Sequence, residues 1–387
     1  MKPKVLIISF SEIRNDPRVM RQINALKDSF DITAVGYGER PDGVFSMRSI
    51  EQRKNSVPEK ILGSLGLVFG RCEWYYWNNR NTIQSRMGIG NNRFDLILAN
   101  EVDALPLALE VSNGVPVHVD LHEFAPDEFS ENLLWRIIMA PYRGYLCRTY
   151  LGKAAQSTTV GRAIAAEYGV RFQVNPKVVY NAPEFVGLHP TPVSDPIRLI
   201  HHGAAIRSRR IELMIETMKL LDHRFSLDLM LVNSDSSYFT ELQMLAEKTS
   251  GVRIIPPVPM REIPSRINAY DMGIYLLPPN NFNSANALPN KFFEFVQGRL
   301  GIAVGPSVEM AQLVTKYDLG IVSDDFSAQG MASALNSLTL EQVAWFKRHA
   351  DIAARDLCFE KSRTVFCELI DSLVRTRIPP GASKFHD

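Results

Sequence analysis

One segment in the second half of the chain combines a lysine, a glutamate and a helix start in a pattern suited to a nucleotide. Residues 286–298 follow an apolar run and a loop rich in proline and asparagine, and then take on helical spacing. Backbone N–H groups at a helix N-terminus favour a diphosphate. Lys291 lies in the predicted first turn, and Glu294 projects from the same face, where a carboxylate suits the two hydroxyls of a ribose. The simpler alternative is an acid favoured at a helix start beside a solvated lysine.

A glycine followed by arginines begins the same half of the chain. Gly203 comes after the apolar run 197–202, and Arg207, Arg209 and Arg210 follow within a few residues. A guanidinium binds phosphate oxygens in a fork, so this turn is a second candidate for a diphosphate site. Alternatively, these arginines form an exposed helix start.

Three polar turns in the first half follow predicted strands. Asp16 and Arg18 come after the first strand, with Asp16 placed as a helix N-cap. Asp103 follows a later strand, and His122 and Glu123 follow the next one. His122 lies just past the carboxyl end of its strand, where side chains reach ligands in open α/β sheets. A lone histidine at such a position is more often structural.

The segment LPNKFFEFVQGRLGIAVG resembles the donor-nucleotide segment of GT-B retaining glycosyltransferases, in particular family 4 (group 1). Pro289, Lys291 and Glu294 fit the family pattern of Pro-x-Lys-x-x-Glu followed by a glycine and a short apolar strand. The glycine comes one place early, and Arg299 stands at the expected position. Asn286 stands where the family has the first of two acids, so this chain lacks a negative charge there.

The N-terminal turns resemble the same family. The sequence around Asp16 and Arg18 is similar to its DPRV motif, residues 100–103 to its short acidic turn, and residues 120–123 to its DxHE motif. At the glycine turn, Ala204 replaces an arginine, and Arg209 stands where a lysine is expected. The resemblance covers nearly the whole chain, and its C-terminal motif is the most specific.

The resemblance implies a role for each of these residues. It implies catalytic positions at His122, Asn286 and Arg209, donor-nucleotide binding by Gly203, Arg209, Asn290, Lys291 and Glu294, and acceptor or cleft positions at Asp16, Arg18, Asp103 and Glu123. It also implies a glycosyltransferase of the hexosyltransferase type that moves a sugar from a nucleotide diphosphate-sugar with retention of configuration. The cations would replace a metal, so no cofactor is expected.

Two other functions stay open from the sequence. One is a GT-B nucleotide-sugar epimerase, which would act on the donor without an acceptor. The other is a non-catalytic GT-B relative that serves as a binding partner, because Ala204 and Asn286 depart from the family pattern. The chain has no GxGxxG after the first strand and no P-loop motif, which argues against oxidoreductases and P-loop NTPases. His201 and His202 are adjacent in a predicted strand, so their side chains should point to opposite faces rather than share a metal.

Short apolar runs alternate with helix-length amphipathic stretches, which predicts an α/β fold with two Rossmann-like domains facing each other across a cleft. Strands are predicted at 5–9, 32–35, 96–99, 117–120, 157–160, 177–180, 197–202, 227–232, 253–255, 272–276, 302–304 and 320–322. Helices are predicted at 16–30, 210–221, 238–248, 263–268, 291–297 and 308–316. The first domain should span 1–185 and bind the acceptor, and the donor domain should span 186–360. Residues 361–387 should form a helix that crosses back to the first domain, plus a tail. The Pro-rich stretch 181–196 is the predicted linker.

Composition limits the class of protein. Forty-three Lys and Arg against 42 Asp and Glu argue against a nucleic-acid partner. Four scattered cysteines without a CxxC pair argue against a disulfide framework or structural zinc. No run reaches the roughly 18–20 apolar residues of a membrane span, and VLIISF is interpreted as a buried strand rather than a signal peptide. A cytoplasmic protein is therefore expected.

Two aromatic stretches of the first half are interleaved with arginines, at 60–86 and at 133–153. Such stretches suit an acceptor groove or a membrane interface. They predict a glycan or lipid-linked acceptor, as in polysaccharide biosynthesis, with peripheral contact at the inner membrane face. Ordinary helix packing is the alternative.

Overall fold

The computed structural model describes residues 2–51, 57–90 and 92–375, which form two compact units. Unit 1 contains the chain up to Val179 and from Arg363 onward, and unit 2 contains Tyr180–Ser362. The predicted domain limits were 185/186 and 360/361, so the observed divisions differ from them by only a few residues.

The described part of unit 1 has a parallel sheet of seven strands in the order β3-β2-β1-β4-β5-β6-β7. Its strands are β1 (Lys4–Glu12), β2 (Asp31–Tyr37), β3 (Ser46–Ser49), β4 (Leu96–Asn100), β5 (Val117–Leu121), β6 (Gln156–Thr159) and β7 (Lys177–Val178). The central strands β4 and β5 are buried throughout, as expected of a parallel sheet covered on both faces. The strand order reverses between β1 and β4, where open α/β sheets bind ligands.

The helices of unit 1 include several that the sequence pattern did not predict. They are α1 (Pro17–Leu26), α2 (Val57–Val68), α3 (Cys72–Trp77), α4 (Arg80–Ile89), α5 (Leu105–Glu110), α6 (Leu133–Tyr150), α7 (Arg162–Phe172) and most of α16 (Phe359–Arg375). As predicted, Asp16 caps α1: its side chain accepts hydrogen bonds from the backbone N–H of Arg18 and Val19. Helix α16 packs on unit 1, where the rings of Phe366 and His118 meet edge to face.

The described part of unit 2 has a second parallel sheet, of six strands in the order β10-β9-β8-β11-β12-β13. Its strands are β8 (Ile197–Ala204), β9 (Phe225–Val232), β10 (Val252–Ile255), β11 (Met272–Tyr275), β12 (Gly301–Val304) and β13 (Gly320–Val322). The predicted strands of this half are all present, within about two residues of their ends. Here the order reverses between β8 and β11.

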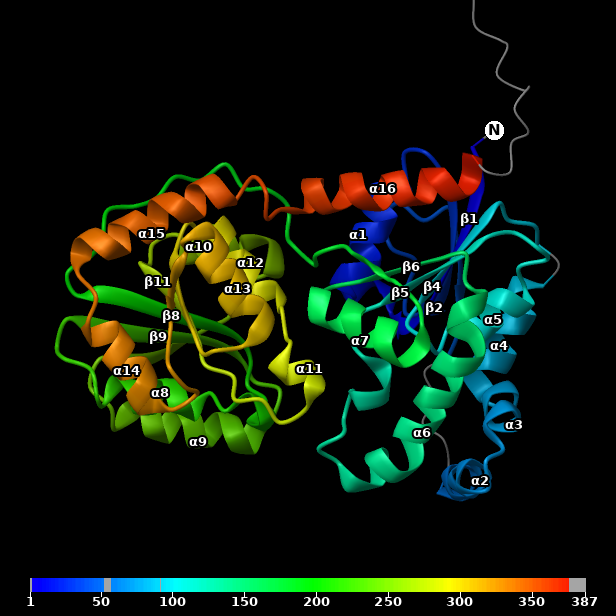
Figure 1. Ribbon diagram of the computed structural model, residues 1–387, viewed down its shortest axis with the longest axis horizontal. Helices are drawn as coiled ribbons and strands as arrows, with labels where there is room; N and C mark the ends of the chain where they lie inside the picture. The colour runs from blue at the N-terminus through cyan, green and yellow to red at the C-terminus, as the bar shows by residue number, and fades with distance from the viewer. Residues whose placement is uncertain (1, 52–56, 91, 376–387) are drawn as a thin grey trace, which may run out of the picture. The chain divides into compact units, whose positions relative to one another are not determined.

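The sheet of unit 2, with helices on both of its faces in Figure 1, separates two hydrophobic cores. The helices of this unit are α8 (Glu212–Met218), α9 (Ser236–Glu247), α10 (Ile263–Ile267), α11 (Phe282–Ala285), α12 (Asn290–Gln297), α13 (Val308–Tyr317), α14 (Ala328–Asn336) and α15 (Leu340–Ala353). Helices α8, α9 and α14 cover one face, and α10, α12 and α13 cover the other. Helix α8 begins two residues after the predicted start, because Arg210 has a left-handed backbone with φ 51°.

The Pro-rich stretch predicted as a linker is built into unit 2. Lys347 donates hydrogen bonds to Thr191, and the backbone N–H of Ser194 donates to the carboxylate of Asp271. The buried guanidinium of Arg299 donates to the carbonyl of Val186 at 2.7 Å. The stretch is therefore fastened to the surface of unit 2 by these bonds, with Ala182 as its buried residue. Among the described residues, no helix combines the length and apolar character that a membrane-spanning segment requires.

Candidate active site

Three residues predicted to bind a diphosphate come together in unit 2. Gly203 lies near the carboxyl end of β8 with φ 134°, a conformation that glycine tolerates best. A Cβ atom added there would lie 3.3 Å from Nζ of Lys291 and 3.6 Å from Nη1 of Arg209. The glycine turn, the arginine after it and the first turn of α12 therefore form one cationic corner at the carboxyl ends of β8 and β11.

Lys291 is buried in this corner. Its ammonium lies 3.4 Å from Nε2 of His201 and 4.0 Å from the centroid of the Tyr275 ring. Nδ1 of His201 lies 3.0 Å from the carbonyl of Ile274, which can only accept, so Nδ1 carries the proton and Nε2 accepts from Lys291. Burial, followed by the nearby guanidinium of Arg209, lowers the pKa of Lys291 well below its ordinary value, although Glu294 opposes this. A buried cation beside a second cation is an environment that an anion would stabilise.

Glu294 lies one helical turn after Lys291 and is 4% exposed. One of its carboxylate oxygens lies 3.5 Å from Nε2 of His202. Burial and the charge of Lys291 lower the pKa of His202 to about 3, so this imidazole is neutral at ordinary pH. His201 and His202 thus face different partners, Lys291 and Glu294. Across the described residues, no group of three or more His, Cys, Asp or Glu side chains is arranged to hold a metal ion.

The two predicted asparagines lie on either side of the loop that leads into α12. Asn286 is buried at the end of α11, and its side-chain amide donates to the carbonyl of Phe282 at 2.9 Å. Asn290 is the first residue of α12, and Pro289 before it provides no side-chain cap. This helix start therefore keeps the character of an anion site.

Arg207 and Arg210, the other two arginines after the glycine turn, take other partners. Arg207 forms a bidentate, exposed ion pair with Glu241 at 2.6 and 2.8 Å. Arg210 pairs with Glu212 at 2.6 Å. Arg209 is the arginine that lies beside Lys291.

Arg299 explains one departure from the family pattern. Its backbone has φ 60°, a left-handed conformation that glycine adopts most easily. The side chain is fully buried, and its Nε donates to Asp351 at 2.6 Å. The contacts of this side chain to Asp351 and Val186 hold a residue in a conformation that usually requires glycine.

In unit 1, the guanidinium of Arg18 lies in a network of buried hydrogen bonds. Its guanidinium donates two hydrogen bonds to Asp120, at 2.7 and 2.8 Å, and a third to the carbonyl of Val179 at 2.6 Å. Gln22 and Thr158 donate to the same carboxylate. Arg18 is 5% exposed, so its donors are used within the protein. Asp16 likewise serves as the N-cap of α1.

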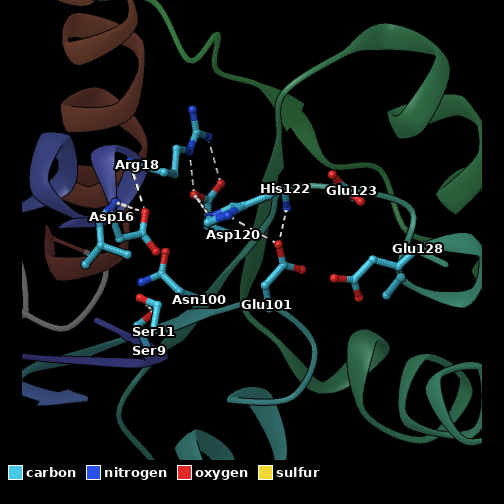
Figure 2. Close-up of polar contacts among 12 residues, drawn as sticks. Ser9, Ser11, Asp16, Arg18, Asn100, Glu101, Asp120, His122, Glu123 and Glu128 are labelled. Carbon is cyan, nitrogen blue, oxygen red and sulfur yellow. Dashed lines mark hydrogen bonds and ion pairs between the residues drawn. The ribbon is translucent and has the colours of Figure 1, made fainter. Parts of the chain in front are cut away.

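His122 lies between two carboxylates (Figure 2). Its Nε2 is 3.3 Å from Asp120, and its Nδ1 is 3.2 Å from Glu101, which also accepts from the His122 backbone N–H. Burial alone would lower the pKa of His122, but Glu101 and Asp120 outweigh it and raise the pKa to about 9. Burial raises the pKa of Asp120, but the Arg18 guanidinium overcomes that and holds it well below its ordinary value. His122 is therefore protonated at neutral pH beside an ionised aspartate.

Two further residues of this region were not predicted as site residues. Glu101 has φ 68°, and its carboxylate is buried, where the positive charge of His122 offsets the cost of ionising it. Arg143 of α6 donates to Asp103 at 2.6 Å and lies 3.4 Å from Glu128. Glu101 follows β4 just as His122 follows the adjacent β5, a signal present in the sequence. No local pattern indicates Arg143, because a long helix brings it back to the sheet.

Glu123, a predicted cleft residue, is exposed, and its carboxylate lies on the side of His122 away from Arg18 (Figure 2). Partial loss of water around this carboxylate, followed by the nearby carboxylate of Glu128, raises its pKa to about 7. Unit 1 therefore brings His122, Asp103 and Glu123 to the edge where β4 and β5 end. Unit 2 brings together Gly203, Arg209, Lys291 and Glu294.

Comparison with solved structures identifies the fold. The chain is similar to Anabaena HepE in complex with UDP and glucose, with 15% identity over 96% of this chain and 100% of that one, at a TM-score of 0.67. It is similar to an α,α-trehalose-phosphate synthase (UDP-forming) from Burkholderia xenovorans in complex with glucose-6-phosphate, with 11% identity over 95% and 100% of the two chains, at 0.65. It is also similar to a glycosyltransferase from Rickettsia africae, with 9% identity over 97% and 99%, at 0.67.

No protein-family model and no curated protein matches the sequence. The structural likeness extends over nearly the full length of each neighbour, and both sheets have the Rossmann-like strand order. The predicted α/β fold class is thereby confirmed: the chain consists of two Rossmann-like domains of the kind found in GT-B glycosyltransferases.

Proposed function

We propose that this protein is a glycosyltransferase that moves a hexose from a uridine diphosphate-sugar to an acceptor with retention of configuration. The observation that carries the proposal is the corner of Gly203, Arg209, Lys291 and Glu294 in unit 2. Two cations, an uncapped helix start and a buried carboxylate lie at the position where Rossmann-like sheets bind nucleotides. The UDP bound by Anabaena HepE supports uridine as the base.

In the proposed mechanism, Lys291, Arg209 and the N–H groups of α12 stabilise the negative charge that develops on the departing diphosphate. These cations do the work of a metal, so no cofactor is required. Glu294 accepts hydrogen bonds from the ribose hydroxyls. His122, held protonated beside Asp120 and Glu101, contributes its positive charge at the reacting centre, and Asn286 contacts the donor sugar through its amide oxygen. The exposed carboxylate of Glu123 belongs to the acceptor side.

Ala204 and Asn286 favour a second candidate, a GT-B relative that binds nucleotide without turnover. Each removes one charged group that the family pattern places at the donor. The observed corner keeps Arg209 and Lys291 in place, which favours the enzyme. Product analysis separates the candidates: transfer needs an acceptor, an epimerase changes the donor alone, and a binding protein leaves the donor intact.

A thermal-shift panel tests the donor site. We expect UDP to raise the melting temperature selectively over GDP, ADP, TDP and NAD. A ligand at a hundred times its dissociation constant stabilises the folded state by about 2.7 kcal/mol, which is readily visible. Glu294→Ala should abolish the selective shift because it removes the ribose acceptor. The matched control is Glu247→Ala, an exposed glutamate of α9, which should respond like the unmodified protein.

Absence of a shift with every nucleotide would contradict the proposed donor site. If UDP raised the melting temperature of the Glu294→Ala protein as much as that of the unmodified protein, Glu294 would not be part of the donor site.

We also propose a cytoplasmic protein that attaches to the inner membrane face to reach a lipid-linked acceptor. Helix α2 packs against α6, and both expose large apolar side chains. These are Ile61, Leu62, Leu65 and Val68 on α2 and Leu133, Leu134 and Ile137 on α6. Arg71 and Arg136 are exposed near them. An apolar face with basic neighbours suits the boundary between headgroups and acyl chains.

Flotation with vesicles rich in phosphatidylglycerol tests this attachment. The protein should float with the vesicles, and the double substitution Leu62→Glu and Leu134→Glu should return it to the soluble fraction. Ile352→Glu, at an exposed isoleucine of unit 2, is the control that should still float. If the unmodified protein stays in the soluble fraction, the membrane proposal is overturned, and a soluble glycan becomes the proposed acceptor.

A further inference from the structure

Unit 1 contains an open pocket that neither the donor corner nor His122 uses. Its volume is about 240 Å³. It is lined by Phe10 of β1, Tyr37 of β2, Tyr75 and Tyr76 of α3, Asn79, Asn81 and Thr82 around the start of α4, Asp103, and Met139, Tyr142 and Arg143 of α6. One water needs only about 10–15 Å³ of such space, so the pocket has room for a small organic ligand such as a single sugar ring.

The aromatic lining is fixed in position. The rings of Tyr75 and Tyr142 meet edge to face with their centroids 5.0 Å apart. The hydroxyl of Tyr76 donates to the carbonyl of Asp103 at 2.9 Å and accepts from the backbone N–H of Leu107 at 3.0 Å. Because their positions are set within the protein, these side chains present preformed apolar surface. A pyranose has an apolar C–H face that packs on such surface.

The polar lining is dense and uncharged overall. Asn81 donates to the hydroxyl of Tyr37 at 2.6 Å, and the Asn79 side chain accepts from the Asn81 backbone. Among the lining residues, Asp103 has the only carboxylate and Arg143 the only guanidinium, and the two groups are 2.6 Å apart. The other side of that guanidinium faces Glu128. Amides, phenols and a neutralised ion pair suit the hydroxyl rim of a sugar, whereas a phosphate would face Asp103 without a cation to spare.

We propose that this pocket binds one neutral pyranose ring, and that this ring is the part of the acceptor that receives the transferred sugar. The pocket shares Asp103 and Arg143 with the polar edge that holds Glu101 and His122, which places a sugar next to that edge. The acceptor role rests on the proposed function, whereas the binding of a neutral sugar stands on the pocket alone.

Saturation-transfer difference NMR on the full chain tests the proposal. The probes are the methyl glycosides of glucose, galactose, mannose and N-acetylglucosamine, with glucose 6-phosphate for comparison. At least one neutral glycoside should show transfer and bind at least about tenfold more tightly than the phosphate. Tyr75→Ala should remove this signal by deleting an aromatic wall. Asn81→Asp should weaken it at least about tenfold, because it keeps the shape and adds a second negative charge.

Tyr145→Ala is the matched control, since Tyr145 lies on α6 but packs on Tyr150 outside the pocket. The UDP-dependent thermal shift checks the fold of each variant. The proposal is overturned if no neutral glycoside binds, if the signal survives both pocket variants, or if glucose 6-phosphate binds best. A glycoside signal without any nucleotide response would keep the sugar site and remove its acceptor role. A nucleotide response without a glycoside signal would keep the donor site and overturn this inference.

Discussion

Lys291→Met is expected to lower the rate of sugar transfer by about 10²–10³-fold, the usual cost of removing one preorganised charge donor from a developing anion. The same change should raise the melting temperature of the unliganded protein. Lys291 is buried next to Arg209, and its lowered pKa shows that the folded state disfavours its charge. Methionine fills similar space without that penalty. Activity and unliganded stability should therefore change in opposite directions.

The pH dependence follows from the same lowered pKa. A lysine whose pKa is lower in the folded than in the unfolded protein binds more protons when the chain unfolds. Lys291 therefore lowers the free energy of unfolding below its ordinary pKa of about 10.4. This cost shrinks as pH rises. A bound diphosphate places negative charge beside Lys291, which favours the charged form of the lysine. UDP binding should therefore raise the pKa of Lys291. Between the free and the bound pKa this appears as proton uptake, seen by calorimetry as a binding enthalpy that varies with the ionisation enthalpy of the buffer.

Lys248→Met, at an exposed lysine of unit 2, is the control for both readouts. It should change neither the transfer rate nor the proton uptake. A Lys291→Met protein that transfers sugar within a few-fold of the normal rate would show that the corner does not stabilise the leaving group. A lower unliganded melting temperature would show that Lys291 is needed for packing.

Arg18→Met is expected to destabilise unit 1 by about 3–5 kcal/mol, the range found when one partner of a buried ion pair is removed. The change would leave the carboxylate of Asp120, itself 1% exposed, without the two hydrogen bonds that Arg18 donates. The measurement is urea unfolding followed by tryptophan fluorescence in a Trp345→Phe background. Three of the four tryptophans, Trp74, Trp77 and Trp135, lie in unit 1, so the signal then reports that unit.

The loss should depend on pH. In the unmodified protein the pKa of Asp120 is held below its ordinary value, so the ion pair contributes fully above about pH 4, and the contribution falls as pH drops toward the folded value. In the variant, Asp120 is still buried but has lost the guanidinium, so its pKa rises. Its carboxyl then takes up a proton at a higher pH than in the unmodified protein. The difference between the two proteins should therefore be largest near neutral pH and shrink in acid.

The control for Arg18→Met is Arg14→Met, which removes an arginine that pairs with Glu39 at 3.3 Å on the surface of the same unit. It should leave the unfolding midpoint unchanged, since exposed pairs contribute little. If Arg18→Met instead unfolded at the same urea concentration as the unmodified protein, the Arg18–Asp120 pair would not stabilise the unit. If the variant were equally stable but no longer transferred sugar, Arg18 would belong to the ligand site predicted from the sequence.

The sequence by itself determined the start of α12 and every strand of the two sheets except β3, a short edge strand that the pattern did not predict. Buried parallel strands are short apolar runs, a local property, so β8 to β13 appear near the predicted limits. The N-cap at Asp16 is equally local. Helices α2–α7 were not predicted, because their apolar residues are shared between the core and exposed surface and give weak periodicity.

Only the tertiary structure decided what each polar residue does. Gly203, Arg209 and Lys291 come from separate segments, and the parallel sheet brings them together because β8 and β11 are neighbours. Arg18 and Arg209 look alike as sequence, yet one lies against a buried aspartate and the other beside a buried lysine. A charge acquires its role from its partners. Those partners lie far away along the chain, and no local pattern records them.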